Sequence, residues 1–378
     1  FTVSVAMACV AISAPFLGAI ADFSGKKKQF LAFFCSGGIL FTGLLYFIGE
    51  GDYWLGALFF IPAYIGFSGS NVFYNGFLPE ISTDETIGRI SGLGWALGYI
   101  GGGILLVINL IMLKYPHFLG FPRNYFTVHH CFLSVAVWWG IFSLPIFLRV
   151  QERGRQRSLP HGENYLRIGF SRVVHTLKTV GRYRELSKFL VAFLIYNDGI
   201  QTIIILASIF GAEVLGMGTE ELIVYFLLVQ GTAFVGSLVF GVLADVLGNK
   251  RTILIALVVW ILVVVWAYVL GLFWSPKREY WILGIMAGLV LGGSQATSRS
   301  LQGLFTPEAN SAEFFGFYAV AGKFASIFGP LVYGLILSIT GSLRKGILSL
   351  ILFFVVGMII LCTVDEKKGR VEKLHFIT

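Results

Sequence analysis

The stretch Gly18-Ala-Ile-Ala-Asp22-Phe-Ser-Gly25-Lys26-Lys27-Lys28 returns 223 residues later as Gly241-Val-Leu-Ala-Asp245-Val-Leu-Gly248-Asn249-Lys250-Arg251. Each copy lies where a long apolar segment meets a basic turn. A turn that is repeated between membrane-spanning segments indicates a duplicated helical body, of the kind that secondary transporters use. These two copies therefore decide the fold class that the rest of the sequence has to fit.

The composition is that of an integral membrane protein. Of the 378 residues, 56% are hydrophobic and 13% are charged, about half the charged fraction of a typical soluble domain. The apolar residues form runs of roughly 20, the length that crosses the hydrocarbon core of a bilayer. The sequence thus predicts an all-α integral membrane protein with about eleven transmembrane helices. We place them at 1–22, 29–48, 53–77, 89–113, 126–149, 188–210, 222–244, 251–273, 280–304, 313–340 and 344–364.

The basic residues indicate the orientation of these spans. A net charge of +8 would also suit a protein that binds nucleic acid. However, 21 of the 28 Lys and Arg residues lie on one side if the connections alternate, and only six lie on the other. Cytoplasmic loops carry such an excess of positive charge. We therefore expect the turn at 25–28 to be cytoplasmic, and we expect contact with a lipid bilayer and none with nucleic acid.

The repeat predicts four parts of the chain. We expect an N-terminal bundle at 1–149, a basic cytoplasmic linker at 150–187, a C-terminal six-helix bundle at 188–364 and a cytoplasmic tail at 365–378. Apolar residues of the linker recur at helical spacing between basic residues. This pattern fits a helix on the inner membrane surface, and a solvated tether between the bundles is the alternative.

The two halves differ by one span. Two predicted spans, 188–210 and 222–244, precede Asp245, whereas only one precedes Asp22. If the halves are copies of each other, the first half lacks the counterpart of 188–210. We therefore expect two six-helix bundles in the intact arrangement, with the first helix absent from this chain.

The repeated aspartates are candidates for a conformational latch. The glycines beside them allow helix backbones to approach closely. Each aspartate can accept hydrogen bonds from the N-terminus of a neighbouring helix, whose dipole favours negative charge. We expect Asp22 to meet the helix start at 313–316 and Asp245 to meet the one at 87–89, which would hold the halves together until they rock. The latch candidates are Gly18, Asp22, Gly25, Gly241, Asp245, Gly248, Arg89 and Glu313.

A weaker repeat supports the same duplication. Pro79-Glu80, Gly88 and Gly101 match Pro307-Glu308, Gly316 and Gly329 at an offset of 228 residues. The two glycine-rich helices at 89–113 and 313–340 are therefore expected to be counterparts. Their small residues permit close helix packing.

Several motifs resemble those of known transporters. The repeated turn is similar to the signature loop of the major facilitator superfamily. The autophagy-related vacuolar amino-acid effluxer family and its bacterial relatives resemble this chain at Phe73-Tyr-Asn-Gly-Phe-Leu-Pro-Glu80, Gly88-Arg-Ile-Ser-Gly92, Tyr196-Asn-Asp-Gly199, Gly293-Ser-Gln-Ala-Thr-Ser-Arg299 and Glu313-Phe-Phe-Gly-Phe-Tyr318. The resemblance implies a major-facilitator-type fold and a secondary transporter, with amino-acid efflux known for the fungal members. It also implies a multi-pass protein of the bacterial inner membrane, or of the vacuolar membrane in a fungus.

Polar side chains inside the predicted spans are candidates for a substrate or proton site, because they are costly in lipid and usually face a cavity or a partner. Asp198 and Lys323 each lie about ten residues into a span, near mid-membrane. We expect them to flank a wet cavity, where Asp198 would receive an amine or a proton and Lys323 a carboxylate. The alternatives are that the two charges form an ion pair with each other or that each pairs elsewhere. The full candidate set is Asp198, Asn197, Gln201, Lys323, Arg299, Gln295, Asn71 and Asn75.

Arg299 is expected to be a second, shallower contact for an anionic group. Its alternative role is to extend to the membrane interface. His129-His130-Cys131 could suggest a metal, but adjacent residues on a helix point about 100° apart. We interpret it as the start of an interfacial helix and expect no metal site.

The predicted function is transport of small polar solutes, foremost amino acids, by alternating access. The sequence has no phosphate-binding loop and no hydrolase or metalloprotease motif. We therefore expect neither an enzyme nor a cofactor. The expected partners are a small-molecule substrate and, optionally, a coupling proton, and the protein is expected to be a monomer. A drug or amphiphile exporter of the same fold, and a non-transporting receptor or assembly factor, are the alternatives.

Overall fold

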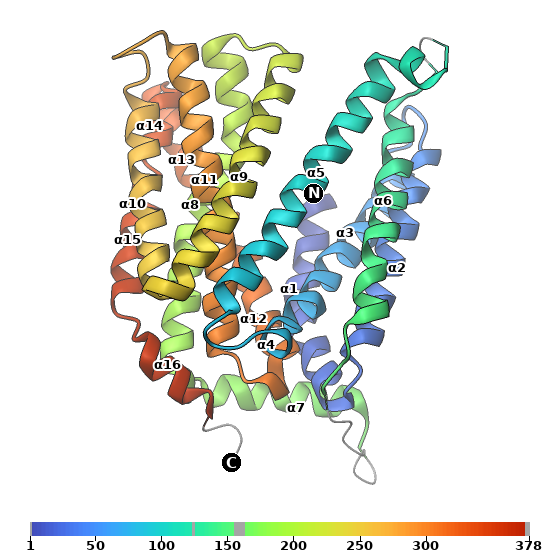
Figure 1. The fold of residues 1–378 in the computed structure, drawn as a ribbon, viewed down its shortest axis with the longest axis vertical. Coiled ribbons are helices and arrows are strands. Elements are labelled where there is room, and N and C mark those ends of the chain that lie inside the picture. Colours follow the sequence, from blue (N-terminus) through green and yellow to red (C-terminus); the bar gives the residue numbers. More distant parts are fainter. Residues whose placement is uncertain (1, 123–124, 155–162, 375–378) are drawn as a thin grey trace. The chain divides into compact units, whose positions relative to one another are not determined.

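A computed structural model describes residues 2–122, 125–154 and 163–374 (Figure 1). Among these residues the only regular secondary structure is helical. Eleven segments are long and apolar enough to cross a membrane, five before the basic linker and six after it. The predicted all-α membrane fold and its spans are confirmed. Residues 155–162 of the predicted linker and 375–378 of the predicted tail lie outside the described residues.

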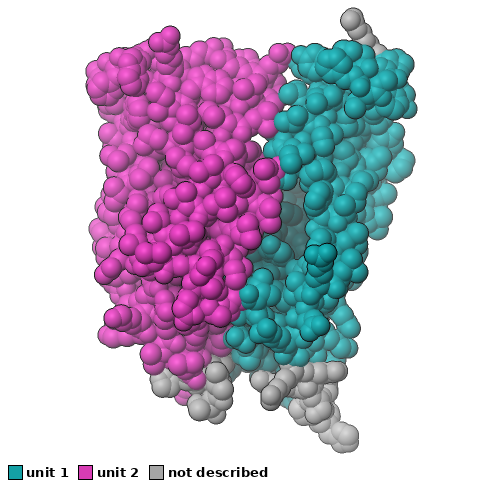
Figure 2. Space-filling model, in the orientation of Figure 1, with its two compact units in different colours: residues 1–81, 101–178, 308–320 teal, residues 82–100, 179–307, 321–378 magenta. Residues whose placement is uncertain are grey.

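The chain forms two compact units, and each unit contains a short segment from the other half of the sequence (Figure 2). Unit 1 consists of residues 1–81, 101–178 and 308–320, and unit 2 of 82–100, 179–307 and 321–378. Helix α5 (Ile87–Lys114) therefore begins in unit 2 and ends in unit 1. Helix α12 (Ser311–Phe324) does the reverse.

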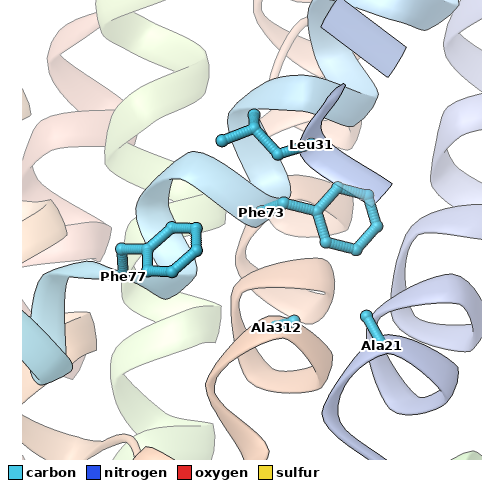
Figure 3. Close-up of a cluster of buried hydrophobic side chains, with 5 residues drawn as sticks. All are labelled: Ala21, Leu31, Phe73, Phe77 and Ala312. Carbon is cyan, nitrogen blue, oxygen red and sulfur yellow. The ribbon is translucent and has the colours of Figure 1, made fainter. Parts of the chain in front are cut away.

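Unit 1 has a core in which aromatic rings pack beside small residues. Its other elements are α1 (Thr2–Ser24), α2 (Lys27–Leu44), η1 (Leu45–Phe47), α3 (Tyr53–Gly76), α4 (Leu78–Ile81), η2 (Pro116–Leu119), α6 (Val128–Arg149), α7 (Tyr165–Lys178) and η4 (Glu308–Asn310). Ala21, Leu31, Phe73, Phe77 and Ala312 form a buried cluster (Figure 3). The two alanines leave room for α1 and α12 to approach, and the phenylalanines fill the space beside them.

The basic linker contains α7, which packs on α1 within unit 1. Gly169 lies against Ile20, where a Cβ atom would come closer than normal contact. Leu166, Phe170 and Leu177 are exposed on α7. Contact of this apolar face with the inner membrane surface stays a prediction.

Unit 2 depends on close backbone contact between two of its helices. Its other elements are η3 (Val180–Tyr183), α8 (Arg184–Leu215), α9 (Thr219–Leu247), α10 (Asn249–Tyr268), α11 (Pro276–Phe305), α13 (Phe328–Thr340), α14 (Leu343–Leu348), α15 (Ile351–Cys362) and α16 (Glu366–Glu372). A Cβ atom at Gly236 of α9 would overlap the carbonyl oxygen of Leu289 on α11. One at Gly292 of α11 would overlap that of Ala233. Such small residues let helices pack tightly in lipid, where no hydrophobic force drives their association.

The span predicted at 313–340 is present, but it is not one continuous helix. The structure interrupts it at 325–327, between α12 and α13. Pro330 explains the interruption, because in a continuous helix its ring would clash with the carbonyl of Ser326 and it has no N–H to donate. The break lies close to the middle of the span at 308–340.

The contact between α9 and α11 can be tested with a matched pair of alanine substitutions. We expect Gly236→Ala to destabilise the protein by about 1–3 kcal/mol, since the new methyl group must displace the α11 backbone. Gly231, on the same helix, has nothing within 4 Å of an added Cβ atom. Gly231→Ala should be neutral or stabilising, because alanine favours a helix by about 1 kcal/mol over glycine. Thermal unfolding of the purified protein in detergent would measure both, and equal midpoints would contradict this packing.

Candidate functional site

Asp22 caps the start of α12 in unit 1. Its two carboxylate oxygens accept hydrogen bonds from the backbone N–H groups of Ala312 at 3.1 Å and Glu313 at 2.8 Å. Gly18 makes this approach possible, since a Cβ atom there would overlap the Ala312 carbonyl oxygen. The positive end of the α12 dipole stabilises the carboxylate. The contact expected between Asp22 and this helix start is therefore present.

Asp245 makes the same kind of contact in unit 2. Its carboxylate accepts hydrogen bonds from the backbone N–H groups of Gly88 at 2.7 Å and Arg89 at 3.0 Å, at the start of α5. The Nε atom of Arg89 also lies 3.3 Å from the carboxylate. Gly241, one turn earlier on α9, faces Gly88, whose carbonyl oxygen would lie 2.9 Å from an added Cβ atom. The second expected contact is present as well.

These contacts correct the alignment of the weaker repeat. Gly88 occupies in unit 2 the place that Ala312 occupies in unit 1, facing the glycine one turn before the aspartate. Gly92, which lies against Ser237, is then the counterpart of Gly316, which lies against Ala14. The structural offset at this contact is 224 residues, and the offset of 228 is wrong here. Gly88 and Gly92 are one helical turn apart, so residue identity alone could not distinguish them.

A second pair of carboxylates, which sequence analysis missed, caps the helices that follow the basic turns. In unit 1, Glu152 accepts hydrogen bonds from the backbone N–H groups of Lys27 and Lys28 at the start of α2. In unit 2, Glu366 accepts one from Lys250 at 3.0 Å, at the start of α10. Burial raises the pKa of Glu152, and the two N–H groups oppose that shift. The available signal was the pattern Val-x-Glu, which follows the last span of each half.

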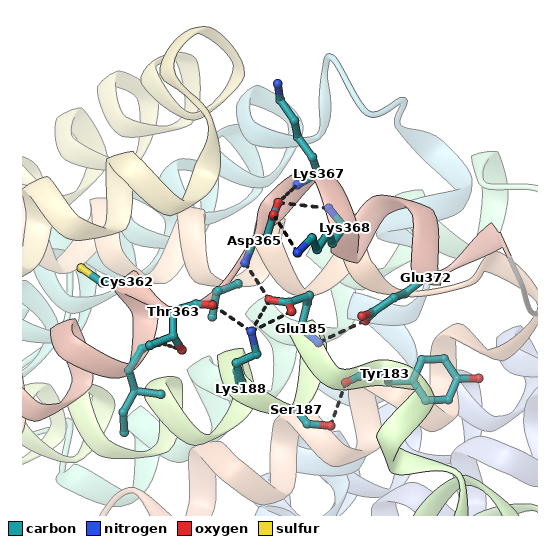
Figure 4. A network of polar contacts seen from close by, with 12 residues as sticks. Tyr183, Glu185, Ser187, Lys188, Cys362, Thr363, Asp365, Lys367, Lys368 and Glu372 are labelled. Atoms are coloured by element: carbon teal, nitrogen blue, oxygen red, sulfur yellow. Dashed lines mark hydrogen bonds and ion pairs between the residues drawn. The ribbon is translucent and has the colours of Figure 1, made fainter.

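Carboxylates also attach the tail helix α16 to α8 within unit 2 (Figure 4). Glu185 accepts hydrogen bonds from the Lys188 ammonium at 2.7 Å and from the backbone N–H of Asp365 at 2.6 Å. Glu372 in turn accepts the backbone N–H of Glu185 at 3.1 Å. Burial raises the pKa of Glu372. The first part of the predicted tail is thus a fixed part of unit 2.

A polar and aromatic stripe on α5 faces two of the predicted site residues on α11, all within unit 2. The Nε atom of Arg299 donates to Ser91 Oγ at 2.9 Å, and its Nη2 atom donates to the Ser91 carbonyl oxygen at 2.6 Å. The guanidinium carbon lies 5.4 Å from the ring centre of Trp95. One turn along each helix, the Tyr99 hydroxyl donates to Gln295. The α5 residues were not among the predicted site residues, although their four-residue spacing puts them on one helix face.

Arg299 is held inside unit 2. Only 6% of its surface is exposed. A side chain that extended to the membrane interface would be more exposed, so the interfacial alternative does not fit. The cluster of Ser91, Trp95, Tyr99, Gln295 and Arg299 is hereafter called the α5–α11 cluster.

Asp198 caps a helix, where a wet cavity was predicted. It is fully buried on α8, and its carboxylate accepts hydrogen bonds from the backbone N–H groups of Phe328 at 3.0 Å and Gly329 at 2.9 Å. These are the first residues of α13. Lys323 lies in the last turn of α12. Asp198 therefore lies at the positive N-terminus of α13, and Lys323 lies near the negative C-terminus of α12. Each charge is favourable beside the helix dipole that it meets. The wet cavity expected between Asp198 and Lys323 stays a prediction.

The chain matches one protein family over almost its whole length. The family described as "Vacuole effluxer Atg22 like" matches residues 1–374. The chain belongs to this Atg22-like family. It is therefore a multi-pass membrane transporter of the major facilitator type and not an enzyme.

Individual relatives agree with this assignment. YxiO of Bacillus subtilis (strain 168), described as an uncharacterized MFS-type transporter, is 34% identical over 368 residues, which cover 97% of this chain and 84% of YxiO. Autophagy-related protein 22 of Kluyveromyces lactis is 27% identical over 381 residues, covering 93% of this chain and 75% of that protein. The solved structure of the proton:xylose symporter XylE has a TM-score of 0.74 at 14% identity, over 100% of this chain and 88% of XylE. That likeness shows a shared fold.

The remaining candidates of the Atg22-like chain lie in different places. Asn197 is buried beside Asp198 on α8, and Gln201 follows one turn later. Asn71 and Asn75 belong to α3 in unit 1, where the Asn71 amide donates to the Phe67 carbonyl oxygen of its own helix at 2.9 Å.

The histidine pair has a structural role at a helix start. His130 and Thr127 form a capping box at the N-terminus of α6. Within the described residues, no group of three His, Cys, Asp or Glu side chains is arranged to hold a metal ion.

The contribution of the repeated aspartates can be measured by replacing each with asparagine. Asparagine keeps one acceptor oxygen but loses the charge that the helix dipole favours, an effect of about 1 kcal/mol. We expect Asp245→Asn to leave the protein folded and to change labelling of a cysteine placed at Leu93 on α5 several-fold. Glu50→Gln, which removes an exposed carboxylate in the loop before α3, is the control. Unchanged labelling in both Asp22→Asn and Asp245→Asn would contradict a latch.

Proposed function

We propose that this Atg22-like transporter exports amino acids or similar small polar solutes by alternating access, and that the α5–α11 cluster binds the substrate carboxylate. The observation that carries the proposal is Arg299, a guanidinium buried in a membrane-spanning helix. A buried charge is costly unless it is paired and hydrogen-bonded. A transporter would keep a buried arginine, despite its cost in stability, at the place where the arginine binds the substrate.

The chemistry of the cluster suits a zwitterionic solute. Guanidinium groups bind carboxylates through two parallel hydrogen bonds, which fix the orientation of the bound group. Ser91 holds the guanidinium through two hydrogen bonds, and Trp95 lies within cation–π distance of it. Trp95 and Tyr99 could also contact the apolar part of an amino acid.

The two repeated aspartates belong to the same proposal as a conformational latch. Each joins a helix of one sequence half to the start of a helix of the other half. Alternating access moves such halves relative to each other. In this proposal the two contacts form in one state of the cycle and open in the other.

Transport by the full-length protein in proteoliposomes would test the carboxylate assignment. We expect uptake of a neutral amino acid to exceed uptake of its carboxamide, and Arg299→Gln to abolish that preference. The expected loss is at least about tenfold, because charge-assisted hydrogen bonds contribute about 1.5–3 kcal/mol each. Arg299→Lys should retain part of the preference.

The control is Arg278→Gln, which removes an exposed arginine from the same helix. Equal transport of acid and carboxamide by the unmodified protein would contradict the assignment. Uptake of lipophilic cations without any uptake of amino acids would favour the amphiphile exporter.

A further inference from the structure

The break between α12 and α13 lies inside a membrane span. The span extends over 308–340, and residues 325–327 leave the helical path. Hydrocarbon offers no hydrogen-bond partners, so N–H groups freed by a break need acceptors from the protein. The N–H groups of Phe328 and Gly329 have the carboxylate of Asp198 as their acceptor. Broken helices of this kind mark ion and substrate sites in secondary transporters.

The contact between Asp198 and α13 requires a glycine. A Cβ atom at Gly329 would overlap Thr202 Oγ1 and lie 2.8 Å from the Asp198 carboxylate. Thr202 is itself held in place, because its hydroxyl donates to the Asp198 carbonyl oxygen at 2.7 Å. The first turn of α13 therefore fits against α8 at this one point.

A helix end, rather than a cation, stabilises the charge of Asp198. In the described part of the chain its carboxylate forms no ion pair, and its partners are the two N–H groups of α13. Lys323 lies across the break on α12. The helices packed against α8 carry further titratable groups. They are Tyr333 on α13, Cys362 on α15, Glu220, Glu221, Tyr225 and Asp245 on α9, and Lys277, Arg278, Glu279, Tyr280 and Arg299 on α11. The groups of α16 and η3 lie toward Glu185, about 20 Å along α8 from Asp198.

Protonation would change what this contact can do. As a carboxylate, Asp198 offers one oxygen to each N–H group. When one oxygen takes a proton from the aqueous phase it becomes a hydroxyl donor, and one good acceptor oxygen remains. One N–H group of α13 would then lack its partner in an apolar medium, which is unfavourable.

A continuous helix offers those N–H groups other acceptors. In α-helical geometry, the N–H of Phe328 would bond to the carbonyl of Phe324, and that of Gly329 to the carbonyl of Ala325. We propose that Asp198 is a proton-binding site and that its protonation closes the break between α12 and α13 into one helix that stays kinked at Pro330. This inference deepens the proposed function, on which it rests for its role in transport, because it would couple the conformation of α13 to a proton gradient.

Hydrogen exchange of the full-length protein in lipid nanodiscs, without substrate, would test this directly. The backbone amide exchange rate of residues 324–330 is divided by the rate of residues 333–340. The ratio removes the pH dependence that hydrogen exchange has in any peptide. We expect this ratio to change about tenfold between pH 5.5 and pH 8, or about 1.4 kcal/mol. Asp198→Asn cannot ionise and should give the same ratio at both pH values. Asp365→Asn is the control, because it alters a carboxylate that caps α16 outside the membrane.

Pro330→Ala supplies a variant that leaves the titrating group intact. It removes the obstacle to a continuous helix, favours the closed form and should therefore move the midpoint of the change to higher pH. A midpoint that Pro330→Ala does not move would overturn the inference, as would a pH-independent ratio in the unmodified protein or a pH-dependent one in Asp198→Asn. If Asp198→Asn does not fold, the pH midpoints of Pro330→Ala and the unmodified protein still test the inference.

The measurement is independent of the proposed substrate. A protein that transports amino acids but shows no pH-dependent exchange at 324–330 would refute the proton site and leave the proposed function standing. A protein with the expected exchange that transports no amino acid would support the proton site and refute the proposed substrate.

Discussion

A backbone N–H group at a helix start inside or beside a membrane needs an acceptor, and in this protein the acceptor is repeatedly a carboxylate. Asp22, Asp245, Glu152, Glu366 and Asp198 each accept hydrogen bonds from the first residues of a helix in their own unit. The helix dipole stabilises the negative charge, and the charge satisfies N–H groups that lipid cannot. The position of α12, α5, α2, α10 and α13 depends on these contacts.

The duplicated contacts are not equivalent in their surroundings. Arg89 lies beside the Asp245 contact in unit 2, and its side chain is 61% exposed. At the corresponding place in unit 1 stands Glu313, which is fully buried and accepts a hydrogen bond from Thr176 of α7 at 2.5 Å. The linker helix therefore takes part in the unit 1 contact. Duplication preserved the aspartate and its helix start, while the neighbouring side chains diverged.

The two kinds of site in unit 2 use charge differently. Arg299 contacts a serine and a tryptophan, and in the proposed function its guanidinium binds the carboxylate of the substrate. Asp198 is bonded to the protein backbone, so its charge state and the local conformation must depend on each other. Together they would give one unit a place for a carboxylate and a place for a proton.

The sequence by itself determined the spans, the family and the aspartate turns, because each depends on local patterns of apolar length, glycine and charge. It also located Asp198, Arg299 and Gln295 as unusual polar residues in apolar helices. Only the tertiary structure decided what these side chains contact. The break between α12 and α13 supplies the partners of Asp198. The polar and aromatic stripe on α5 supplies those of Arg299. Hydrogen bonds between residues more than 100 positions apart leave no periodic signal in a single sequence, so their partners emerge only when the helices pack.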